Sequence, residues 1–256
     1  MLSFLGIGAQ KAGTTWLFEQ LRKHPQVRFP AGKELHFWNE PGERTLEWYR
    51  SLFEDPDPAI RQGEITPAYA ILPVDTIREI GRQFPDLRLI YLLRNPIERA
   101  WSSALMALKR AELTIDEASD AWFVDHFRSR GSMMRGDYEQ CIRNWLTVFP
   151  REQLLLRQFE LIKANPKALL IACSRHIGVD EVHWSQEDMT SVGRPVFRGS
   201  RAPLRASLVP VLADIYADKI RRLADYLDWD LDAWLPADLA ATPARSGGMA
   251  GGPVFR

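Results

Sequence analysis

The segment Gly8–Thr15, which follows the apolar run Phe4–Ile7, constrains the fold of this chain more than any other stretch. An apolar strand, a glycine-containing turn and a helix are expected there in that order. Such a turn directs backbone N–H groups and the positive end of the helix dipole toward one point. Lys11 adds a cation, and Thr14 and Thr15 add hydroxyl donors. The sequence therefore predicts that an anionic, nucleotide-like ligand binds directly after the first strand.

Short apolar runs alternate with helix-period segments along most of the chain. We expect strands at 2–7, 87–93 and 154–159, a weaker strand at 63–65, and helices at 14–23, 74–84, 97–109, 138–148 and 208–227. This alternation predicts an α/β fold in which helices cover both faces of a parallel sheet. Ligands of such sheets bind at the carboxyl ends of the strands. Both the first turn and Arg94, which follows the apolar run 89–93, are expected at such ends.

Composition limits the class of protein. A chain of 256 residues with 46% apolar residues can bury one large core, so we expect a single domain over residues 1–236. Residues 237–256 are rich in Ala, Gly and Pro and are expected to form a disordered tail. Basic and acidic residues balance at 33 each, which argues against nucleic acid as a partner.

Cysteine content and hydropathy bear on the cellular compartment. Cys141 and Cys173 are too few for a disulfide framework, and both lie in segments with helical character. We expect reduced thiols and a cytoplasmic protein. No apolar run reaches the roughly 18 residues that a membrane span needs, and no basic leader precedes the first strand.

A second motif lies at Arg94–Ser102. Pro96 suits the first turn of a helix, and Asn95 can cap it. Arg94 is then expected at a strand end, with its side chain directed toward the ligand, and Ser102 is expected two turns into the helix. A guanidinium fork with one hydroxyl suits a phosphate monoester. The alternative is an Arg94 that pairs with a neighbouring carboxylate, such as Glu98, and a solvated serine.

The first loop is not a Walker A motif, which needs adjacent Gly-Lys-Ser/Thr. Lys11 precedes Gly13 here, and Thr14 and Thr15 follow it. That spacing fits a shorter loop that holds one 5′ anion. A plain strand-to-helix turn with a solvated lysine is the competing interpretation.

Together these motifs resemble a known family. Residues 11–15 resemble the 5′-phosphosulfate loop of sulfotransferases that use 3′-phosphoadenosine 5′-phosphosulfate (PAPS), and residues 94–102 resemble their 3′-phosphate motif. The similarity is closest to the heparan-sulfate-type branch and spans about residues 3–235. Lys33–Trp38 looks like the acidic catalytic segment, and Glu64–Tyr69 looks like the segment that lines the acceptor cleft. Tyr138 with 144–146 and 149–150 looks like the helix that follows.

The resemblance implies a P-loop-like fold, PAPS as the donor and 3′-phosphoadenosine 5′-phosphate (PAP) as the product, with no metal. It implies Glu34 as catalytic base, Lys11 as the group that stabilises the leaving phosphate, and His36 as an assisting residue. A lone glutamate is a weak base toward an alcohol, so Glu34 acts in concert or gains basicity from partial burial among Leu35, Phe37 and Trp38. The donor-binding residues implied are Lys11, Ala12, Gly13, Thr14, Thr15, Trp16, Arg94, Ser102, Arg198, Gly199, Ser200 and Arg201. Gly193-Arg194 competes for the last, nucleotide-closing position.

Two residues depart from the family pattern. Ile65 stands where sugar-specific relatives carry a lysine in the cleft segment, and Ser200 stands where they carry a basic residue. One cation near the reacting centre is therefore missing.

The implied reaction is sulfuryl transfer from PAPS to a hydroxyl or amine, of a carbohydrate by the branch resemblance. The acceptor partner is thus a glycan or a small molecule. Two alternatives stay open: a P-loop phosphotransferase of nucleoside-kinase type, and an inactive module that binds PAPS or PAP. The missing Gly-Lys-Thr order speaks against the first, and the retained Lys11 and Glu34 speak against the second.

Overall fold

The computed structural model describes residues 1–186 and 202–240 of the chain. These residues form two compact units, and each unit draws on two stretches of sequence. Of the described residues, 1–94 and 144–186 make up the first unit, and 95–143 and 202–240 make up the second. The β-sheet lies in the first unit. The two strand ends at which the sequence predicts ligand binding, before Ala9 and before Arg94, therefore belong to the same unit.

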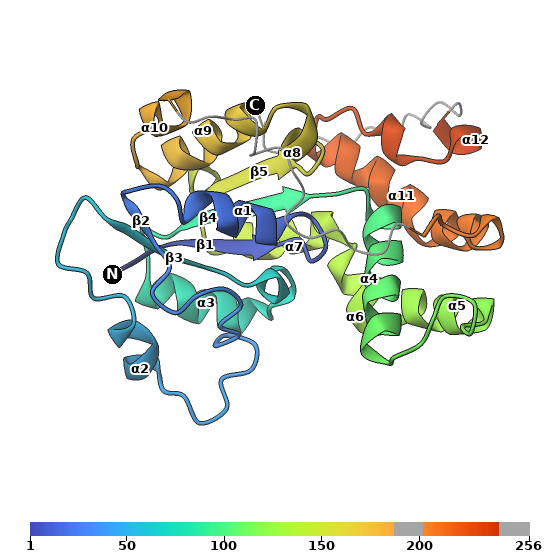
Figure 1. Cartoon of the computed structure of the whole chain (residues 1–256), viewed down its shortest axis with the longest axis horizontal. Coiled ribbons are helices and arrows are strands. Elements are labelled where there is room, and N and C mark those ends of the chain that lie inside the picture. The colour runs from blue at the N-terminus through green and yellow to red at the C-terminus, as the bar shows by residue number, and fades with distance from the viewer. Residues whose placement is uncertain (187–201, 241–256) are drawn as a thin grey trace. The chain divides into compact units, whose positions relative to one another are not determined.

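The sheet has five parallel strands in the order β2-β3-β1-β4-β5 (Figure 1). The predicted α/β fold with a parallel sheet is therefore confirmed. β4 is the most deeply buried strand, because its five residues from Leu89 to Leu93 have no exposed surface. β2 has only two residues and no apolar run, which is why the sequence did not predict it. The strands are β1 (Leu2–Gly8), β2 (Val27–Arg28), β3 (Arg61–Ile65), β4 (Arg88–Leu93) and β5 (Leu154–Gln158).

Helices cover both faces of the sheet. The chain crosses from β1 toward β3 in one direction and returns from β3 over β1 to β4 in the other, so right-handed crossovers place α1 and α3 on opposite faces (Figure 1). The helical elements of the first unit are α1 (Thr14–Leu21), α2 (Leu46–Ser51), η1 (Pro67–Ile71), α3 (Val74–Gln83), η2 (Arg151–Gln153), α8 (Leu161–Ala164), α9 (Pro166–Ile177) and α10 (Val182–Gln186).

The second unit is helical. Arg99 on α4 lies at its centre with no exposed surface and donates from Nη2 to the carbonyl oxygen of Ser132 at 3.1 Å. Its elements are α4 (Pro96–Arg110), α5 (Asp120–Arg128), α6 (Arg130–Arg135), α7 (Tyr138–Leu146, of which 144–146 count with the first unit), η3 (Ala206–Leu208), α11 (Val209–Leu227), η4 (Asp232–Trp234) and α12 (Ala237–Ala240). Residues 241–256 lie outside the described residues, so disorder of the tail stays a prediction.

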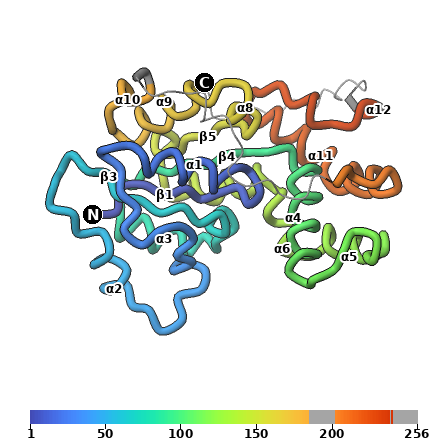
Figure 2. The backbone as a smooth tube through the Cα atoms, in the orientation of Figure 1, coloured from blue at the N-terminus to red at the C-terminus, as the bar shows by residue number. Residues whose placement is uncertain are grey.

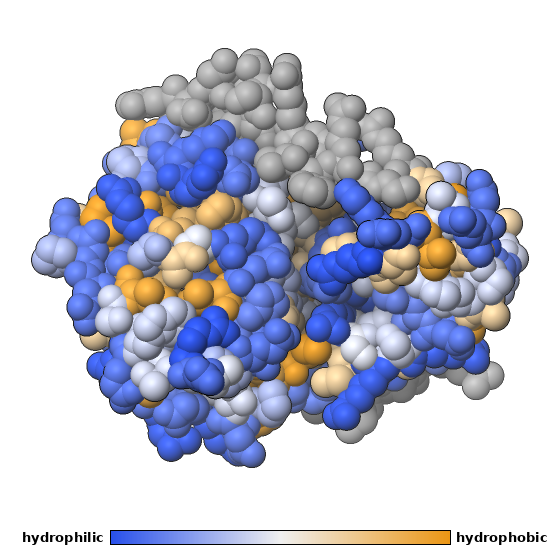
Figure 3. All heavy atoms as spheres, turned by 60° about the horizontal axis from the view of Figure 1, so that its bottom comes forward, coloured by the Kyte–Doolittle hydropathy of each residue, from blue (hydrophilic) through white to orange (hydrophobic). Residues whose placement is uncertain are grey.

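The outer surface is mostly hydrophilic on the face drawn in Figure 3, with small hydrophobic patches between polar side chains. No helix in the described part of the chain combines the length and the apolar character needed to cross a membrane. Cys141 and Cys173 are both free and buried, on α7 and α9 as expected.

Candidate active site

The loop between β1 and α1 takes the form that its sequence predicts. Lys11 and Gly13 have φ angles of 68° and 78°, in the left-handed region that favours glycine. A Cβ atom on Gly13 would lie 2.2 Å from Cδ1 of Ile162, so the position has no room for a side chain. Gly13 is therefore required both by its backbone conformation and by the close approach of the chain near α8.

The start of α1 presents backbone amides without a competing side chain. The first i→i−4 bond runs from the N–H of Leu17 to the carbonyl of Gly13, and no described side chain caps the helix. The N–H of Ala12 donates within the turn to Ala9, at 3.1 Å. An uncapped helix start without an acidic first turn suits an anion.

Side chains around this turn divide into buried and accessible groups. Ala12, Thr14 and Trp16 are buried, with 0%, 5% and 3% exposure, so Trp16 offers a ligand only its backbone. Lys11 and Thr15 are half-buried. Lys11 and Thr15 are thus the accessible polar side chains of the predicted donor loop.

Arg94 lies beside this loop, at the carboxyl end of β4. Its Nη1 donates to the carbonyl oxygen of Lys11 at 3.0 Å, and its guanidinium carbon lies 4.8 Å from the ring centre of Phe159. Arg94 therefore contacts the loop directly, as two neighbouring strand ends of one sheet require. Ser102 lies on α4 in the second unit and is half-buried.

The segment with Glu34 and His36 is anchored at the same edge of the sheet. The N–H of Glu34 donates to the carbonyl of Ile65 at 3.0 Å, and Ile65 pairs with Gly6 of β1. The segment runs between β2 and α2 without a regular helix or strand. Figure 2 shows the path of the chain on either side of α2. In the first unit, Lys11 and Arg94 thus follow the ends of β1 and β4, and Glu34, on the loop after β2, is bonded to the end of β3.

Lys11, Glu34 and His36 share an unusual backbone conformation. Glu34 and His36 have φ angles of 63° and 58°, and Lys11 has 68°. Only Glu112 and Asp228 join them among the non-glycine residues of the described part. Positive φ angles at non-glycine residues cost free energy and concentrate at functional sites. This shared conformation marks Lys11, Glu34 and His36 as candidates for functional residues.

The Glu34 side chain is accessible, with 44% exposure. It forms an ion pair with Lys33, and its Oε2 lies 3.9 Å from Nε2 of His36. His36 Nδ1 contacts Oδ1 of Asn39 at 3.1 Å. Of the two alternatives for Glu34, the exposure of its carboxylate favours concerted action over burial among its neighbours, of which Phe37 packs inward.

The buried carboxylate of this region belongs to Glu64. Glu64 is 1% exposed, and its oxygens accept hydrogen bonds from the hydroxyls of Tyr49 (2.7 Å), Thr66 (2.6 Å) and Tyr69 (2.7 Å). Burial raises the pKa of the Glu64 carboxyl, and the three hydrogen bonds act in the opposite direction. Ile65 and Tyr69 are also fully buried, so the expected cleft-lining segment turns these side chains inward. A glutamate inside an expected strand was the available signal, but its partner Tyr49 could not be identified from spacing.

The expected nucleotide-closing residues Arg198, Gly199, Ser200 and Arg201, and the competing pair Gly193-Arg194, lie outside the described residues. Ala202 is the first described residue after them. Its carbonyl accepts a hydrogen bond from Nε1 of Trp101 at 2.8 Å, and Trp101 precedes Ser102 on α4.

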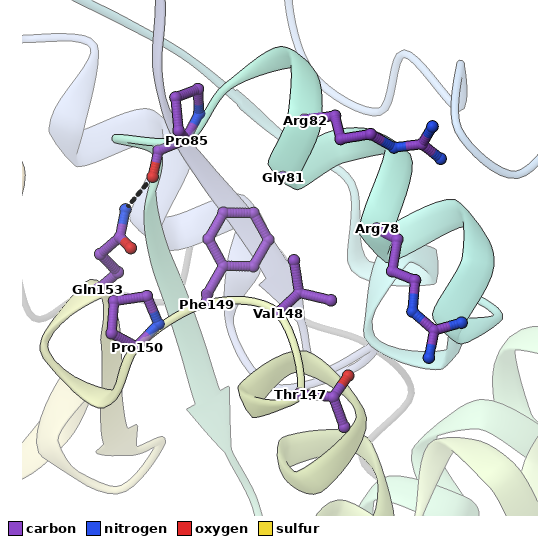
Figure 4. A pocket seen from close by; sticks show the side chains of 9 residues that line it. All are labelled: Arg78, Gly81, Arg82, Pro85, Thr147, Val148, Phe149, Pro150 and Gln153. Atoms are coloured by element: carbon purple, nitrogen blue, oxygen red, sulfur yellow. Dashed lines mark hydrogen bonds between the residues drawn. The ribbon is translucent and has the colours of Figure 1, made fainter.

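Within residues 1–186 and 202–240, no three His, Cys, Asp or Glu side chains gather as a metal site would require. A pocket of about 410 Å³ lies where α3 ends and η2 precedes β5 (Figure 4). Phe149, Val148 and Gln153 line it, and Gln153 donates to the carbonyl of Pro85 at 2.7 Å. It lies at the amino ends of β4 and β5 and is therefore distinct from the loops described above.

Comparison with known proteins gives one family. The family model described as "Sulfotransferase domain" matches residues 3–192. Human heparan sulfate glucosamine 3-O-sulfotransferase 3B1 is 31% identical over 186 residues, covering 69% of this chain and 46% of that protein. The human 3-O-sulfotransferase 6 is 31% identical over 175 residues, covering 62% and 47%. The chain thus spans about half the length of these curated relatives.

Solved structures agree on the fold. A sulfotransferase from Alicyclobacillus acidocaldarius superposes with a TM-score of 0.71 at 25% identity, covering 91% of this chain and 98% of that one. Mouse sulfotransferase SULT7A1, solved with PAP, superposes with a TM-score of 0.55 at 16% identity, covering 86% and 85%. Because the identity to SULT7A1 is only 16%, this similarity shows a common fold and nothing more.

Proposed function

The chain belongs to the sulfotransferase family, and from this premise we propose that it transfers a sulfuryl group from PAPS to a hydroxyl or amine of a carbohydrate. The observation that carries the proposal is the arrangement at the carboxyl edge of the sheet. The uncapped start of α1 follows β1, Arg94 contacts that loop from the end of β4, and Glu34 is anchored at the end of β3. The carbohydrate acceptor is supported by the 3-O-sulfotransferases that the chain resembles.

The residues present suit the donor. The left-handed Lys11–Gly13 turn and the start of α1 can bind the 5′-phosphosulfate through backbone amides, Lys11 and Thr15. Arg94 and Ser102 are proposed for the 3′-phosphate, with 198–201 as the closing segment. When bound, PAPS supplies the sulfuryl group, and PAP is released.

Glu34 is proposed as the base. Its exposed carboxylate can accept the acceptor's proton as the oxygen or nitrogen of the acceptor bonds to sulfur. Lys11 stabilises negative charge on the leaving 5′-phosphate oxygen. His36, 3.9 Å from Glu34, orients that carboxylate. A cytoplasmic location is part of the same proposal and awaits its own test.

Transfer of ³⁵S-sulfate from PAPS to a panel of glycans, lipids and phenols, in the presence of EDTA, tests the function. We expect glycan labelling that needs no magnesium, because the protein's own cations stabilise the leaving group. Labelling that requires magnesium and ATP, or no labelling from PAPS at all, would contradict the proposal.

The variant Glu34→Gln tests the base. It keeps the size of the side chain and removes its basicity, so PAP should bind as in the parent while kcat falls on the order of a hundredfold or more. Glu40→Gln, an exposed carboxylate six residues along the same loop, is the matched control and should retain the parent rate. A Glu34→Gln enzyme as fast as the parent would refute the assignment.

A further inference from the structure

Glu64 places a buried carboxylate directly beneath the segment that carries Glu34 and His36. No cation forms an ion pair with it among the described residues, and hydroxyl groups hold both of its oxygens. An ionised carboxylate only accepts hydrogen bonds, so it fixes the direction in which each hydroxyl donates. The orientations of Tyr49 and Tyr69 are therefore set by Glu64.

Both tyrosines also contact residues 34–38, the segment that carries Glu34 and His36. The Tyr69 hydroxyl donates to Glu64 and accepts from the backbone N–H of Trp38 at 3.3 Å. The Tyr49 ring stacks on Phe37, with ring centres 4.4 Å apart and planes 14° apart, and meets Trp38 edge-on at 5.4 Å. The N–H of Glu34 adds a third link, to the carbonyl of Ile65. Residues 34–38 are thus anchored at three points: through the Tyr69 hydroxyl that Glu64 orients, through the ring of Tyr49, whose hydroxyl donates to Glu64, and through the carbonyl of Ile65.

We propose that Glu64 is a positioning residue for the proposed reaction. Its carboxylate, acting through Tyr69 and Tyr49, holds residues 34–38 in the strained conformation that presents Glu34 and His36. The positive φ angles of both residues support this role, because strained backbone persists only where surrounding contacts determine it. The inference rests on the function proposed above and assigns Glu64 no contact with substrate.

A buried carboxylate at this position carries a desolvation cost that an apolar side chain would avoid. Desolvation opposes the ionised form of Glu64, and glutamine has the same shape without the cost of burying a charge. Glu64→Gln should therefore leave cooperative unfolding in place. Tyr49 and Tyr69 donate to different oxygens of Glu64, and glutamine keeps only one accepting oxygen, so one of the two hydroxyls loses its acceptor and the anchor loosens although the fold is kept.

The test measures Glu64→Gln by kinetics and by amide hydrogen exchange. We expect kcat to fall on the order of tenfold to a hundredfold, as misplacement of a catalytic group does, with PAP affinity unchanged. Exchange should accelerate in residues 33–38 and stay at the parent rate in the donor loop, residues 9–16. In a Glu34→Gln background, Glu64→Gln should lower kcat little further, because the group that it positions has already lost its function.

Two tyrosine variants form a matched pair. Tyr69→Phe removes the oxygen that binds the Trp38 N–H, whereas Tyr49→Phe removes a hydroxyl from Glu64 and keeps the stack on Phe37. Tyr69→Phe should therefore lower kcat more than Tyr49→Phe does. This pair decides the question if Glu64→Gln does not fold.

Parent-like kcat and exchange in both Glu64→Gln and Tyr69→Phe would overturn the proposal. So would equal acceleration of exchange in residues 9–16 and 33–38 with loss of PAP binding, which marks a general structural role. If the parent chain transfers no sulfate from PAPS, the proposed function fails, and the exchange comparison still decides whether Glu64 holds the segment.

Discussion

Individual residues show most clearly what local sequence encodes. Gly13, Lys11 and Arg94 were predicted from one turn and one strand end, and the structure places Arg94 on the carbonyl of Lys11. Local geometry was sufficient because adjacent strand ends of a parallel sheet meet at one edge. The exposure of Glu34 and the burial of Glu64 were not predictable in this way. They depend on Tyr49 and Tyr69, which are 15 and 5 residues from Glu64 in sequence.

Gly13→Ala tests the requirement for glycine in the donor loop. Gly32 is a matched control, because its φ is 73° but nothing lies within 4 Å of a Cβ built there, whereas Gly13 has φ 78° and a Cβ contact at 2.2 Å. Gly32→Ala should cost about 1 kcal/mol of unfolding free energy, from backbone strain alone. Gly13→Ala should cost clearly more and abolish PAP binding. Urea titration and calorimetry measure both, and equal effects of the two substitutions would contradict the packing argument.

Helices and strands could be predicted from the sequence where a pattern of apolar residues extended over many positions. β1, β4, α3, α4 and α11 lie within a residue or two of their expected bounds, because each has a continuous apolar run or stripe. α9 (Pro166–Ile177) was expected only as a helical segment around Cys173, without bounds, although Asn165 caps it through its side chain and Gly178 ends it in the left-handed conformation. Both capping signals are present in the sequence. They define the two ends of α9 although the apolar periodicity of the helix is weak.

The docking of α9 predicts a pH dependence of stability. His176, in its last turn, bonds through Nε2 to the carbonyl of Gln153, and burial together with the Arg88 charge lowers its pKa to about 4. The unfolded chain binds this proton near pH 6.5, so the stability that neutral His176 provides is complete above that pH and is lost as pH falls toward 4.

Between pH 7 and pH 5 this histidine should account for about 2 kcal/mol of lost unfolding free energy. Urea unfolding of the parent and of His176→Gln at both pH values measures the difference, because glutamine retains a donor for Gln153 and does not titrate. The parent should lose more stability than the variant. Equal losses would show that His176 is not held neutral by its packing.

At the scale of the whole molecule, the sequence predicted one sheet but not how the chain is divided. Residues 95–143 and 202–240 form a helical unit, of which 95–143 interrupts the α/β unit in sequence and 202–240 follows it. Periodicity could not reveal this grouping, because each helix of the second unit reads like a crossover helix of the first. Resemblance over about residues 3–235 indicated the family, which the match over residues 3–192 confirms.

The central claim is that the β1–α1 loop and Arg94 bind a nucleotide that carries phosphate at both its 5′ and 3′ positions. Calorimetric titration of the parent and of Arg94→Ala with PAP and with adenosine 5′-phosphate tests it most directly. The parent should bind PAP more tightly, and Arg94→Ala should weaken PAP binding far more than binding of the 3′-dephospho nucleotide. Arg94 also supports the loop through Lys11, and that role alone would weaken both ligands equally. Equal losses would therefore contradict the account.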